Sequence, residues 1–344
     1  MSTLFEKTHI RTNILTGEQV LVSPHRTKRP WQGKVEAQEI PNTIAYDTSC
    51  YLCATNSRTS GVVNPNYTDT FVFENDFAAL HPAVETKKYK EGLLEATAEK
   101  GICKVICFSP NHSLTLAKMS IDAIVKVIQT WQSEFKALSE KDFVNSIQIF
   151  ENRGDIMGCS NPHPHGQIWA QETIPVEIAK KTKHLLAYYQ QHKTSLLETY
   201  VTQEIAADQR VVYQNEDFVV VVPFWAVWPY ETMIVPKKSA ENMVAMDLNM
   251  ITNYAKAIQR ITAIYDQVFE VSFPYSAGIH QAPTNGENYT GWHWHMSFYP
   301  PLLRSATVKK FMVGYEMFAM PQRDSTPEQA ANSLKKINEK MDQE

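Results

Sequence analysis

The run Cys159-Ser160-Asn161-Pro162-His163-Pro164-His165-Gly166-Gln167 places two histidines two positions apart around a proline. In an extended segment, residues two apart project to the same face, so His163 and His165 are expected to point the same way. Pro164 lacks an amide proton, which predicts a sheet edge or an irregular bend. Gly166 lets a ligand approach the backbone, and Gln167 offers an amide donor on the same side as the histidines.

The spacing of His163 and His165 fits two kinds of site. On spacing alone, a His-x-His pair is a pair of metal ligands or a hydrogen-bonded surface pair. The small, polar run Gly158-Cys159-Ser160-Asn161 before it favours a phosphate site, because successive backbone amides can hold phosphate oxygens. Neutral imidazole is a nucleophile at pH 7, so His165 is suited to attack phosphorus. Gln167 would then stabilise the charge that develops on a phosphoryl oxygen.

The length, the net charge and the N-terminal sequence limit the classes to which this protein can belong. The chain has 344 residues, enough for one large or two medium domains, and a net charge of -4. This charge argues against a nucleic-acid-binding protein, which normally shows a basic face, but it allows a small anionic ligand. No secretory signal follows Met1, and no apolar run approaches the roughly 20 residues of a membrane span. We therefore expect a cytoplasmic enzyme with no membrane or nucleic-acid partner.

The chain has five cysteines, an odd count that argues against a disulfide framework. Cys50 and Cys53 have the spacing of metal ligands, although a redox pair or an incidental pair would look the same. Zinc needs about four ligands, and His112 and His163 are candidates for the other two. A closed site of this kind would be structural, and by holding His163 it would fix the strand that carries His165.

Apolar segments rich in β-branched residues predict strands at 20–23, 70–73, 105–108, 146–151, 219–223 and 233–236. Helices are expected behind the caps Ser120 and Asp247, and a polar connecting helix is expected at 177–200. Thr326-Pro327-Glu328-Gln329 predicts the capping box of a last helix. Strands and long helices without strict alternation favour an α+β fold with an antiparallel sheet.

A weak internal repeat divides the chain. The first half ends on the strand with His163 and His165, and the second ends on Trp292-His293-Trp294-His295-Met296-Ser297, in which Ser297 is aligned with His165. We expect two tandem histidine-triad-like halves in one compact body, sharing an extended, mainly antiparallel sheet with flanking helices. The predicted divisions are residues 1–176, a helical connector at 177–210, and residues 211–344.

Two further groups of residues are candidate ligand contacts. Arg26 and Arg29 could clamp phosphate by bidentate bonds, although a solvated basic turn is an equal alternative. Asn75 and Asp76, followed by Phe77, could bind a uracil or a ribose by hydrogen bonds and stacking. That signal is weak by itself.

Longer motifs carry a resemblance to a known family. They are Ser23-Pro24-His25-Arg26-Thr27-Lys28-Arg29-Pro30-Trp31-Gln32-Gly33, Phe150-Glu151-Asn152-Arg153-Gly154, the run 159–167 and a block at 299–316. Over nearly its whole length the chain resembles the galactose-1-phosphate uridylyltransferases of the histidine-triad superfamily. The resemblance implies transfer of a uridylyl group from UDP-glucose to galactose 1-phosphate, giving UDP-galactose and glucose 1-phosphate. In the family this Leloir-pathway reaction follows a ping-pong route through a uridylyl-histidine.

The resemblance also implies roles for individual residues. His165 matches the nucleophile, and Gln167 matches the donor to the transferring phosphoryl group. The positions of the family's nucleotide and phosphate contacts hold Arg26, Arg29, Asn75, Asp76, Asn152, Gly158, Cys159 and Ser160. The positions of its hexose-phosphate contacts hold Lys310, Phe311, Tyr315, Glu316 and Gln322. Family members donate part of this set across a homodimer, so the partner chain is expected to complete each site.

The two metal sites of the family are matched unequally. Its structural zinc site is matched in full by Cys50, Cys53, His112 and His163. A second site for iron or zinc, present in some members, uses one glutamate and three histidines. Its four positions here hold Lys181, His280, His295 and Ser297. We therefore expect one zinc per chain and no second metal, unless Glu177 or His293 substitutes.

Two other interpretations stay open from the sequence. Another histidine-triad enzyme, such as a dinucleoside polyphosphate phosphorylase or a nucleotidyl hydrolase, would share the His-Pro-His core but not the block from Lys310 to Gln322. A zinc-stabilised nucleotide-binding protein without catalysis is the second, and the intact run from His163 to Gln167 argues against it.

Overall fold

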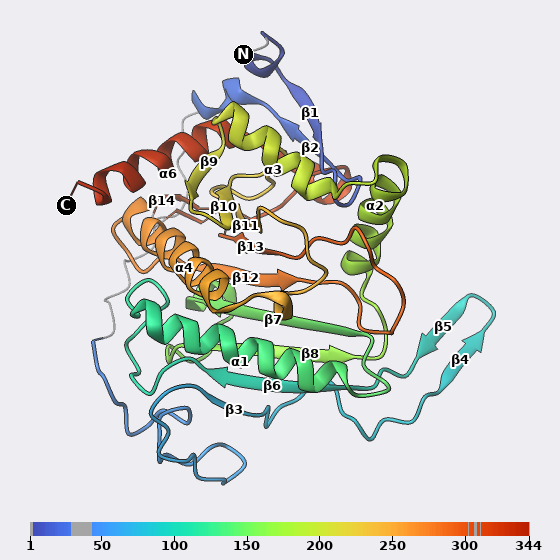
Figure 1. The fold of residues 1–344 in the computed structure, drawn as a ribbon, viewed down its shortest axis with the longest axis vertical. Coiled ribbons are helices and arrows are strands. Elements are labelled where there is room, and N and C mark those ends of the chain that lie inside the picture. Colours follow the sequence, from blue (N-terminus) through green and yellow to red (C-terminus); the bar gives the residue numbers. More distant parts are fainter. Residues whose placement is uncertain (1–2, 29–42, 302, 306–307, 310, 344) are drawn as a thin grey trace.

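The computed structural model describes residues 3–28, 43–301, 303–305, 308–309 and 311–343 (Figure 1). Its centre is a nine-stranded sheet in the order β3-β6-β8-β7-β12-β13-β11-β10-β9. The strands are β3 (Phe71–Glu74), β6 (Gly101–Cys107), β7 (Ser146–Arg153), β8 (His165–Gln171), β9 (Val211–Gln214), β10 (Phe218–Val221), β11 (Thr232–Pro236), β12 (Tyr275–His280) and β13 (His295–Tyr299). Every neighbouring pair is antiparallel, which confirms the predicted α+β fold with one extended sheet.

Two long helices, α1 (Ile121–Ser139) and α4 (Leu248–Val268), lie side by side over one face of this sheet (Figure 1). Both begin where the sequence predicted, because Ser120 and Asp247 accept hydrogen bonds from backbone amides of the first turn. Their apolar faces share one core with alternate residues of the strands, including Ile149 of β7 and Ile168 of β8. This packing leaves the intervening strand residues on the opposite face.

The opposite face is covered over the second half, where helices α2 (Val176–His192) and α3 (Leu196–Ala207) pack on β10 and β11. The sequence predicted a helical stretch over 177–200, and most of it is helical, but it forms two helices and not one. The chain leaves helical geometry at Lys193, which has a φ of 59° and ends α2. Ser195 then caps α3 by accepting a hydrogen bond from the Glu198 amide.

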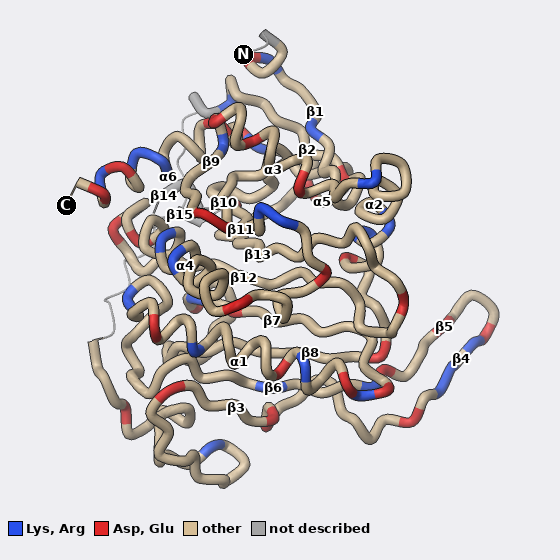
Figure 2. The backbone as a smooth tube through the Cα atoms, viewed as in Figure 1, with Lys and Arg blue, Asp and Glu red and all other residues tan. Residues whose placement is uncertain are grey.

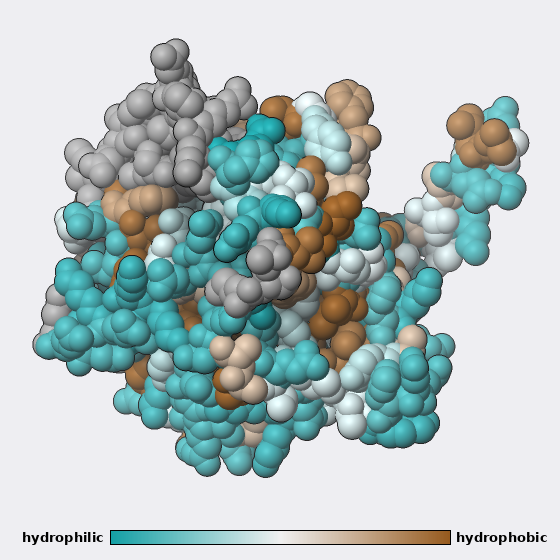
Figure 3. All heavy atoms as spheres, turned by 90° about the horizontal axis from the view of Figure 1, so that it is seen from above, coloured by the Kyte–Doolittle hydropathy of each residue, from teal (hydrophilic) through white to brown (hydrophobic). Residues whose placement is uncertain are grey.

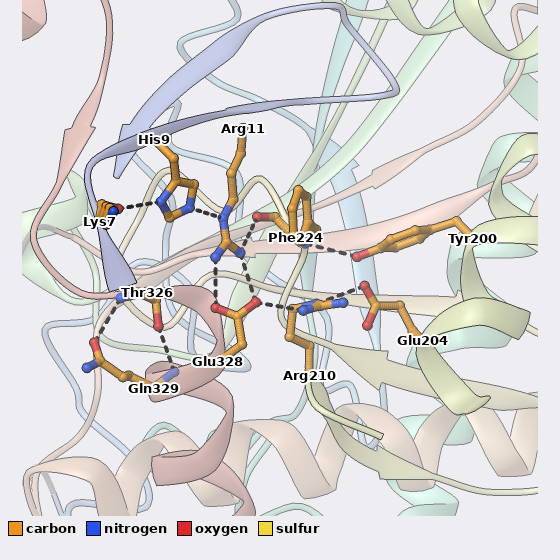
Figure 4. Close-up of polar contacts among 10 residues, drawn as sticks. All are labelled: Lys7, His9, Arg11, Tyr200, Glu204, Arg210, Phe224, Thr326, Glu328 and Gln329. Carbon is orange, nitrogen blue, oxygen red and sulfur yellow. Dashed lines mark hydrogen bonds and ion pairs between the residues drawn. The ribbon is translucent and has the colours of Figure 1, made fainter. Parts of the chain in front are cut away.

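The two ends of the chain meet at a small sheet of β1 (His9–Thr12), β2 (Gln19–Val22) and β16 (Gln322–Arg323). The last helix, α6 (Pro327–Met341), begins with the predicted capping box at Thr326 and packs beside α4 and β9. Arg11 of β1 is fully buried and donates to both carboxylate oxygens of Glu328, at 2.9 and 3.0 Å (Figure 4). Arg210 donates to Glu328 as well, at 2.6 Å, so this network joins three segments.

A hairpin of β4 (Lys88–Glu91) and β5 (Leu94–Thr97) projects from the body (Figures 1 and 3). All its strand residues are exposed, and Leu93 at its tip is 100% exposed. The remaining elements are η1 (Thr3–Glu6), η2 (Pro24–Lys28), η3 (Asp155–Met157), η4 (Met243–Ala245), β14 (Leu303–Ser305), β15 (Val308–Lys309) and α5 (Tyr315–Phe318). Lys and Arg are interspersed with Asp and Glu along the described chain (Figure 2). In that part, no helix is both long and apolar enough to cross a membrane.

The sheet is built from two similar halves that meet between β7 and β12. Moving outward from this junction, the order is β7-β8-β6 on one side and β12-β13-β11 on the other. A long helix follows β6 in the first half and β11 in the second. The halves therefore share one sheet, as the repeat predicted. The division of the chain at 1–176, 177–210 and 211–344 stays a prediction.

The strand register corrects the alignment of the two halves. Phe150 and Gly278 pair across the junction, and their other sheet neighbours are Gln167 and Ser297 respectively. Ser297 thus corresponds to Gln167, and His295 corresponds to His165, as the first residue of each closing strand. The sequence alignment of Ser297 with His165 was wrong by two residues, because it lacked the pairing partners that define register.

Candidate active site and metal centre

Four buried side chains converge beside the start of β8. One ligand atom from each of Cys50, Cys53, His112 and His163 lies within 4.8 Å of all the others. The Cys53 Sγ is 3.5 Å from Nδ1 of both His112 and His163, and the Cys50 Sγ is 3.9 Å from Nδ1 of His163. A tetrahedral zinc site with ordinary Zn–S and Zn–N bonds has ligand separations of about 3.3–3.8 Å. The predicted ligands are therefore together, and their donor set fits a metal ion.

Outer contacts hold His163 in the orientation that this cluster needs. Its Nε2 donates to the Ser109 carbonyl oxygen at 2.8 Å, which leaves Nδ1 free to face the two cysteines. The Asn161 side chain accepts from the His163 amide at 2.9 Å and lies against the Cys50 sulfur. Tyr67 donates to the Leu52 carbonyl oxygen between the two cysteines. These contacts therefore fix the cluster to the segment that carries the two cysteines and to the segment directly before β8.

His165 is the first residue of β8, half-buried, and it has one ring nitrogen engaged. Its Nδ1 lies 2.7 Å from the carbonyl oxygen of His163, an acceptor, so Nδ1 carries the proton. The lone pair is then on Nε2. Burial lowers the pKa of His165 below its ordinary value, which favours the neutral ring. A neutral imidazole with a free Nε2 is the form that can attack an electrophile.

Two amide donors lie on the same face of the sheet as His165. Gln167 follows it by two residues on β8, and its Oε1 accepts from the Trp169 ring at 3.1 Å. Asn152 on the adjoining β7 accepts from the Ser276 hydroxyl at 2.6 Å through its Oδ1. Each side-chain NH2 group is thereby left to donate outward. Beside β7 and β8 this face is only partly buried, in contrast to β10 and β11 in the second half of the sheet.

The loop at 154–160 folds back on its own start before it reaches the histidines. The Gly154 carbonyl oxygen accepts from the amides of Met157 and Cys159, at 3.1 and 3.2 Å. Gly154 and Gly158 have φ values of 87° and 77°, in the region that favours glycine. A cavity of about 620 Å³ adjoins the loop and is lined by Cys159, Ser160, His163 and His165 among others. The structure therefore brings Cys159 and Ser160 of the predicted phosphate run, and the predicted nucleophile His165, to one cavity.

Known proteins are similar to this chain in sequence and in fold. Residues 2–175 match the family model for the N-terminal domain of galactose-1-phosphate uridyl transferase, and residues 180–344 match that for its C-terminal domain. The chain belongs to this family. A galactose-1-phosphate uridylyltransferase of Haemophilus influenzae is 46% identical over 345 residues, covering 98% of each chain. One of Saccharomyces cerevisiae is 45% identical, covering 96% of this chain and 94% of the yeast protein.

The fold of this chain is also similar to that of solved structures. A structure described as a uridylyltransferase superposes with a TM-score of 0.77 at 24% identity, over 96% of this chain and 99% of that one. At this identity the likeness shows the fold alone. The identity to the Haemophilus influenzae and yeast relatives carries the family assignment.

Several predicted nucleotide contacts lie apart from the cavity in this chain. Arg26 is paired with Asp324, its Nε lying 3.2 Å from the carboxylate. Asp76 is paired with Arg58 at 3.3 Å, and Asn75 accepts from the amide two residues later in the chain. Arg29 lies outside the described residues. These positions stay predictions as ligand contacts.

The predicted hexose-phosphate contacts also lie apart from His165. Phe311 and Tyr315 are 70% and 52% exposed, and neither lines the cavity beside His165. Glu316 is paired with Arg323, while Gln322 on β16 donates to Asp324 at 2.9 Å. Lys310 is not among the residues that the structure describes. Within one chain, none of the described members of this set lines the cavity beside His165.

Glu151 and Arg153 line the cavity although the sequence had not marked them as site residues. They flank Asn152 but point to the covered face, where Tyr275 donates to Glu151 at 3.0 Å. Burial raises the pKa of Glu151 to about 7. The alternation of Ile147 and Ile149 along the predicted strand was the available signal, since it places residues 151 and 153 on the buried side.

The second half holds a histidine in the same bonding pattern, but a lysine covers it. His295 Nδ1 lies 3.1 Å from the His293 carbonyl oxygen, as His165 does with His163. The Nε2 of His295 accepts a hydrogen bond from the Lys181 Nζ at 3.1 Å. Lys181 comes from α2 and is 4% exposed, and burial lowers its pKa to about 7. An amine therefore occupies the position beside His295 at which, among the described residues, His165 has no hydrogen-bond partner.

The two residues considered as replacement metal ligands are engaged elsewhere. His293 uses both ring nitrogens, with the Ser195 hydroxyl at 2.9 Å and the Pro236 carbonyl oxygen at 2.9 Å. Glu177 accepts from Lys180 at 2.9 Å on the exposed side of α2. These contacts do not favour a rebuilt second site, and the absence of a second metal stays a prediction.

Proposed function

We propose that this protein transfers a uridylyl group from UDP-glucose to galactose 1-phosphate through a covalent intermediate on Nε2 of His165. The observation that carries this proposal is the bond from His165 Nδ1 to the His163 carbonyl oxygen, beside a cavity that Cys159 and Ser160 share. That bond directs the lone pair of a neutral imidazole away from the backbone. Family membership supplies the substrates, because the relatives bear the name of this reaction.

The two half-reactions balance with one nucleophile and no added reactant. His165 Nε2 bonds to the uridylyl phosphorus while the bond from that phosphorus to the glucose 1-phosphate oxygen breaks. An oxygen of galactose 1-phosphate then attacks the same phosphorus, and the bond to Nε2 breaks. Gln167 and Asn152 donate to phosphoryl oxygens or to the nucleotide beside them. Because one diphosphate bond replaces another, the protein has mainly to position and stabilise charge.

We also propose that the metal held by Cys50, Cys53, His112 and His163 is zinc. Two thiolates and two imidazoles are a common structural zinc set, and all four positions would be filled by the protein. Zinc bound there supplies structure. Through His163 it fixes the carbonyl oxygen that holds the ring of His165.

We also propose that the protein is a homodimer in which each active site contains residues of both chains. Two predicted sugar contacts, Phe311 and Tyr315, and the neighbouring Phe318 are exposed, and none of them lines the cavity in its own chain. The β4–β5 hairpin is also uncovered along its length, and a lone two-stranded hairpin is marginally stable in water. A second copy would cover these surfaces and bring the sugar contacts to His165.

Substrate conversion tests the reaction. The purified protein is incubated with UDP-glucose labelled in glucose and with galactose 1-phosphate. We expect labelled glucose 1-phosphate and unlabelled UDP-galactose in equal amounts. A protein that instead cleaves dinucleoside polyphosphates with phosphate, and leaves UDP-glucose intact, would be the rival phosphorylase and not a uridylyltransferase.

Subunit mixing tests the shared site. His165→Gly and Gln322→Ala chains are each inactive by the proposal, and one site of their heterodimer carries neither change. Random reassortment should restore about a quarter of the wild-type activity, since half of the dimers have one intact site. Heterodimers that form but remain inactive would show that each site is built within one chain.

A further inference from the structure

The loop at 154–160, which carries the predicted phosphate contacts, is held at its C-terminal end by the metal cluster. Asn161 follows the loop directly, and its side-chain oxygen accepts from the His163 amide at 2.9 Å. Its side-chain nitrogen lies 3.4 Å from the Cys50 sulfur. This end is therefore fixed by the first half of the chain.

The N-terminal end of the same loop is held by the second half of the chain. Arg153 is the last residue of β7, and its Nη2 donates to Asp266 and to Ser272, both at 2.9 Å. Asp266 belongs to α4, and it also accepts from the Phe273 amide at 2.9 Å, so it is fixed itself. The Arg153 side chain is 8% exposed and that of Asp266 is 17% exposed. This ion pair therefore joins α4 to the point where the loop begins.

Backbone contacts transmit the position of Arg153 into the loop. Gly154 follows it, has a φ of 87°, and packs so closely on Pro274 that a Cβ atom would lie 2.8 Å from the Pro274 Cβ. The Gly154 carbonyl oxygen accepts from the amides of Met157 and Cys159. A shift of Arg153 would therefore displace Cys159, which lines the cavity with His165.

We propose that Arg153 and Asp266 are positioning residues for uridylyl transfer, by which the second half sets the loop against His165. The inference rests on the proposed function. A buried ion pair is weak support for stability, because apolar residues of similar volume often stabilise as well. Directed bonds between two fixed elements instead define a position, and a misplacement of about 1 Å can cost 100-fold in rate.

Kinetics of the half-reaction test this pair. Single-turnover uridylylation by UDP-glucose is measured in Arg153→Met, Arg153→Lys and Asp266→Asn, together with bound zinc and thermal midpoint. We expect about 100-fold slower transfer in Arg153→Met with full zinc content, and a substantial return of rate in Arg153→Lys. Asp266→Asn should match Arg153→Met within a few-fold, and the double variant should be no slower, since both act through one contact.

A matched control is Lys104→Met, which breaks the ion pair of Lys104 with Glu134 on α1 and does not touch the loop. We expect its transfer rate to stay at the wild-type value. A wild-type transfer rate in Arg153→Met would overturn the proposal that these two residues position the loop. A slow transfer rate in Arg153→Met together with a normal rate in Asp266→Asn would overturn it as well. If Arg153→Met fails to fold, Asp266→Asn and Arg153→Lys carry the same comparison. A wild-type protein without transfer would instead reject the proposed function.

Discussion

At the residue scale, the proposed role of His165 as the nucleophile depends on one hydrogen bond. His165 donates its Nδ1 proton to the His163 carbonyl oxygen, and this leaves Nε2 as the only ring nitrogen with a lone pair. The sequence placed His163 and His165 side by side but could not give them different roles by spacing. Their separation into a metal ligand and a nucleophile needs Cys50, Cys53 and His112, which arrive from distant segments.

His165→Gly should abolish transfer and leave the fold intact. The side chain is only half-buried, so its removal costs little packing, while the route through Nε2 is lost. We expect at least about a 1,000-fold loss of turnover, with unchanged bound zinc and an unchanged circular dichroism spectrum. Normal turnover without added imidazole would reject His165 as the nucleophile.

Lys181 should make stability rise with pH. Burial lowers the pKa of its amine from 10.5 to about 7, so the unfolded chain binds more protons between these values. Stability should therefore increase from pH 7 to pH 10, and this contribution should be missing in Lys181→Met. Urea unfolding at pH 7 and pH 9 measures it. If the free energy of unfolding changed equally with pH in both proteins, burial would not lower the pKa of this amine.

The helices capped by Ser120, Asp247 and Thr326 and the strands with β-branched runs were predictable, but the break between α2 and α3 and the register of the strands were not. Ser120, Asp247 and Thr326 marked their helices because a local hydrogen bond decides where a helix begins. The break between α2 and α3 at Lys193 was missed, because the polar residues around it suit a helix surface as well as a turn. Likewise, the register of β13 could be assigned only from its pairing with β11 and β12.

His163→Asn should damage the metal-binding element before it affects chemistry elsewhere. The variant removes one of four ligands and leaves two buried thiols without their ion. We expect loss of bound zinc, a thermal midpoint lower by several degrees and loss of transfer together. Elemental analysis and calorimetry check this. A variant that retains one equivalent of zinc would show that His163 is not a ligand.

At the scale of the whole molecule, Glu328 joins the two ends of the chain. Burial opposes ionisation of this carboxylate, but the hydrogen bonds from Arg11 outweigh it and lower the pKa to about 2. The resulting stability is complete above the ordinary value of 4.5 and is lost as the pH falls through 2. Glu328→Gln should lose about 3 kcal/mol at pH 7, because Arg11 stays buried without its partner.

Denaturant unfolding at pH 7 and pH 3 separates this effect from general acid sensitivity. The wild-type advantage over Glu328→Gln should shrink at pH 3. A constant difference would show that packing, and not charge, makes the contribution. The sequence predicted the α6 cap but not this network, since Arg11 and Glu328 are 317 residues apart.

One sheet made of two similar halves was predictable from the repeat, but the difference in access to the two closing strands was not. The face over His165 is partly open, whereas α2 places Lys181 against His295. The repeat showed two closing strands with histidines, and only packing shows which one a ligand can reach. Arg153 and Asp266 similarly became visible only when α4 and β7 were brought together.

Mass spectrometry of the protein after exposure to UDP-glucose alone tests the central claim most directly. With no acceptor sugar phosphate present, the account predicts a mass increase of one uridylyl group per chain, located on the peptide that carries His165. Added galactose 1-phosphate should remove it and yield UDP-galactose. An unmodified chain that still forms UDP-galactose, or a uridylyl group on any other residue, would contradict the account.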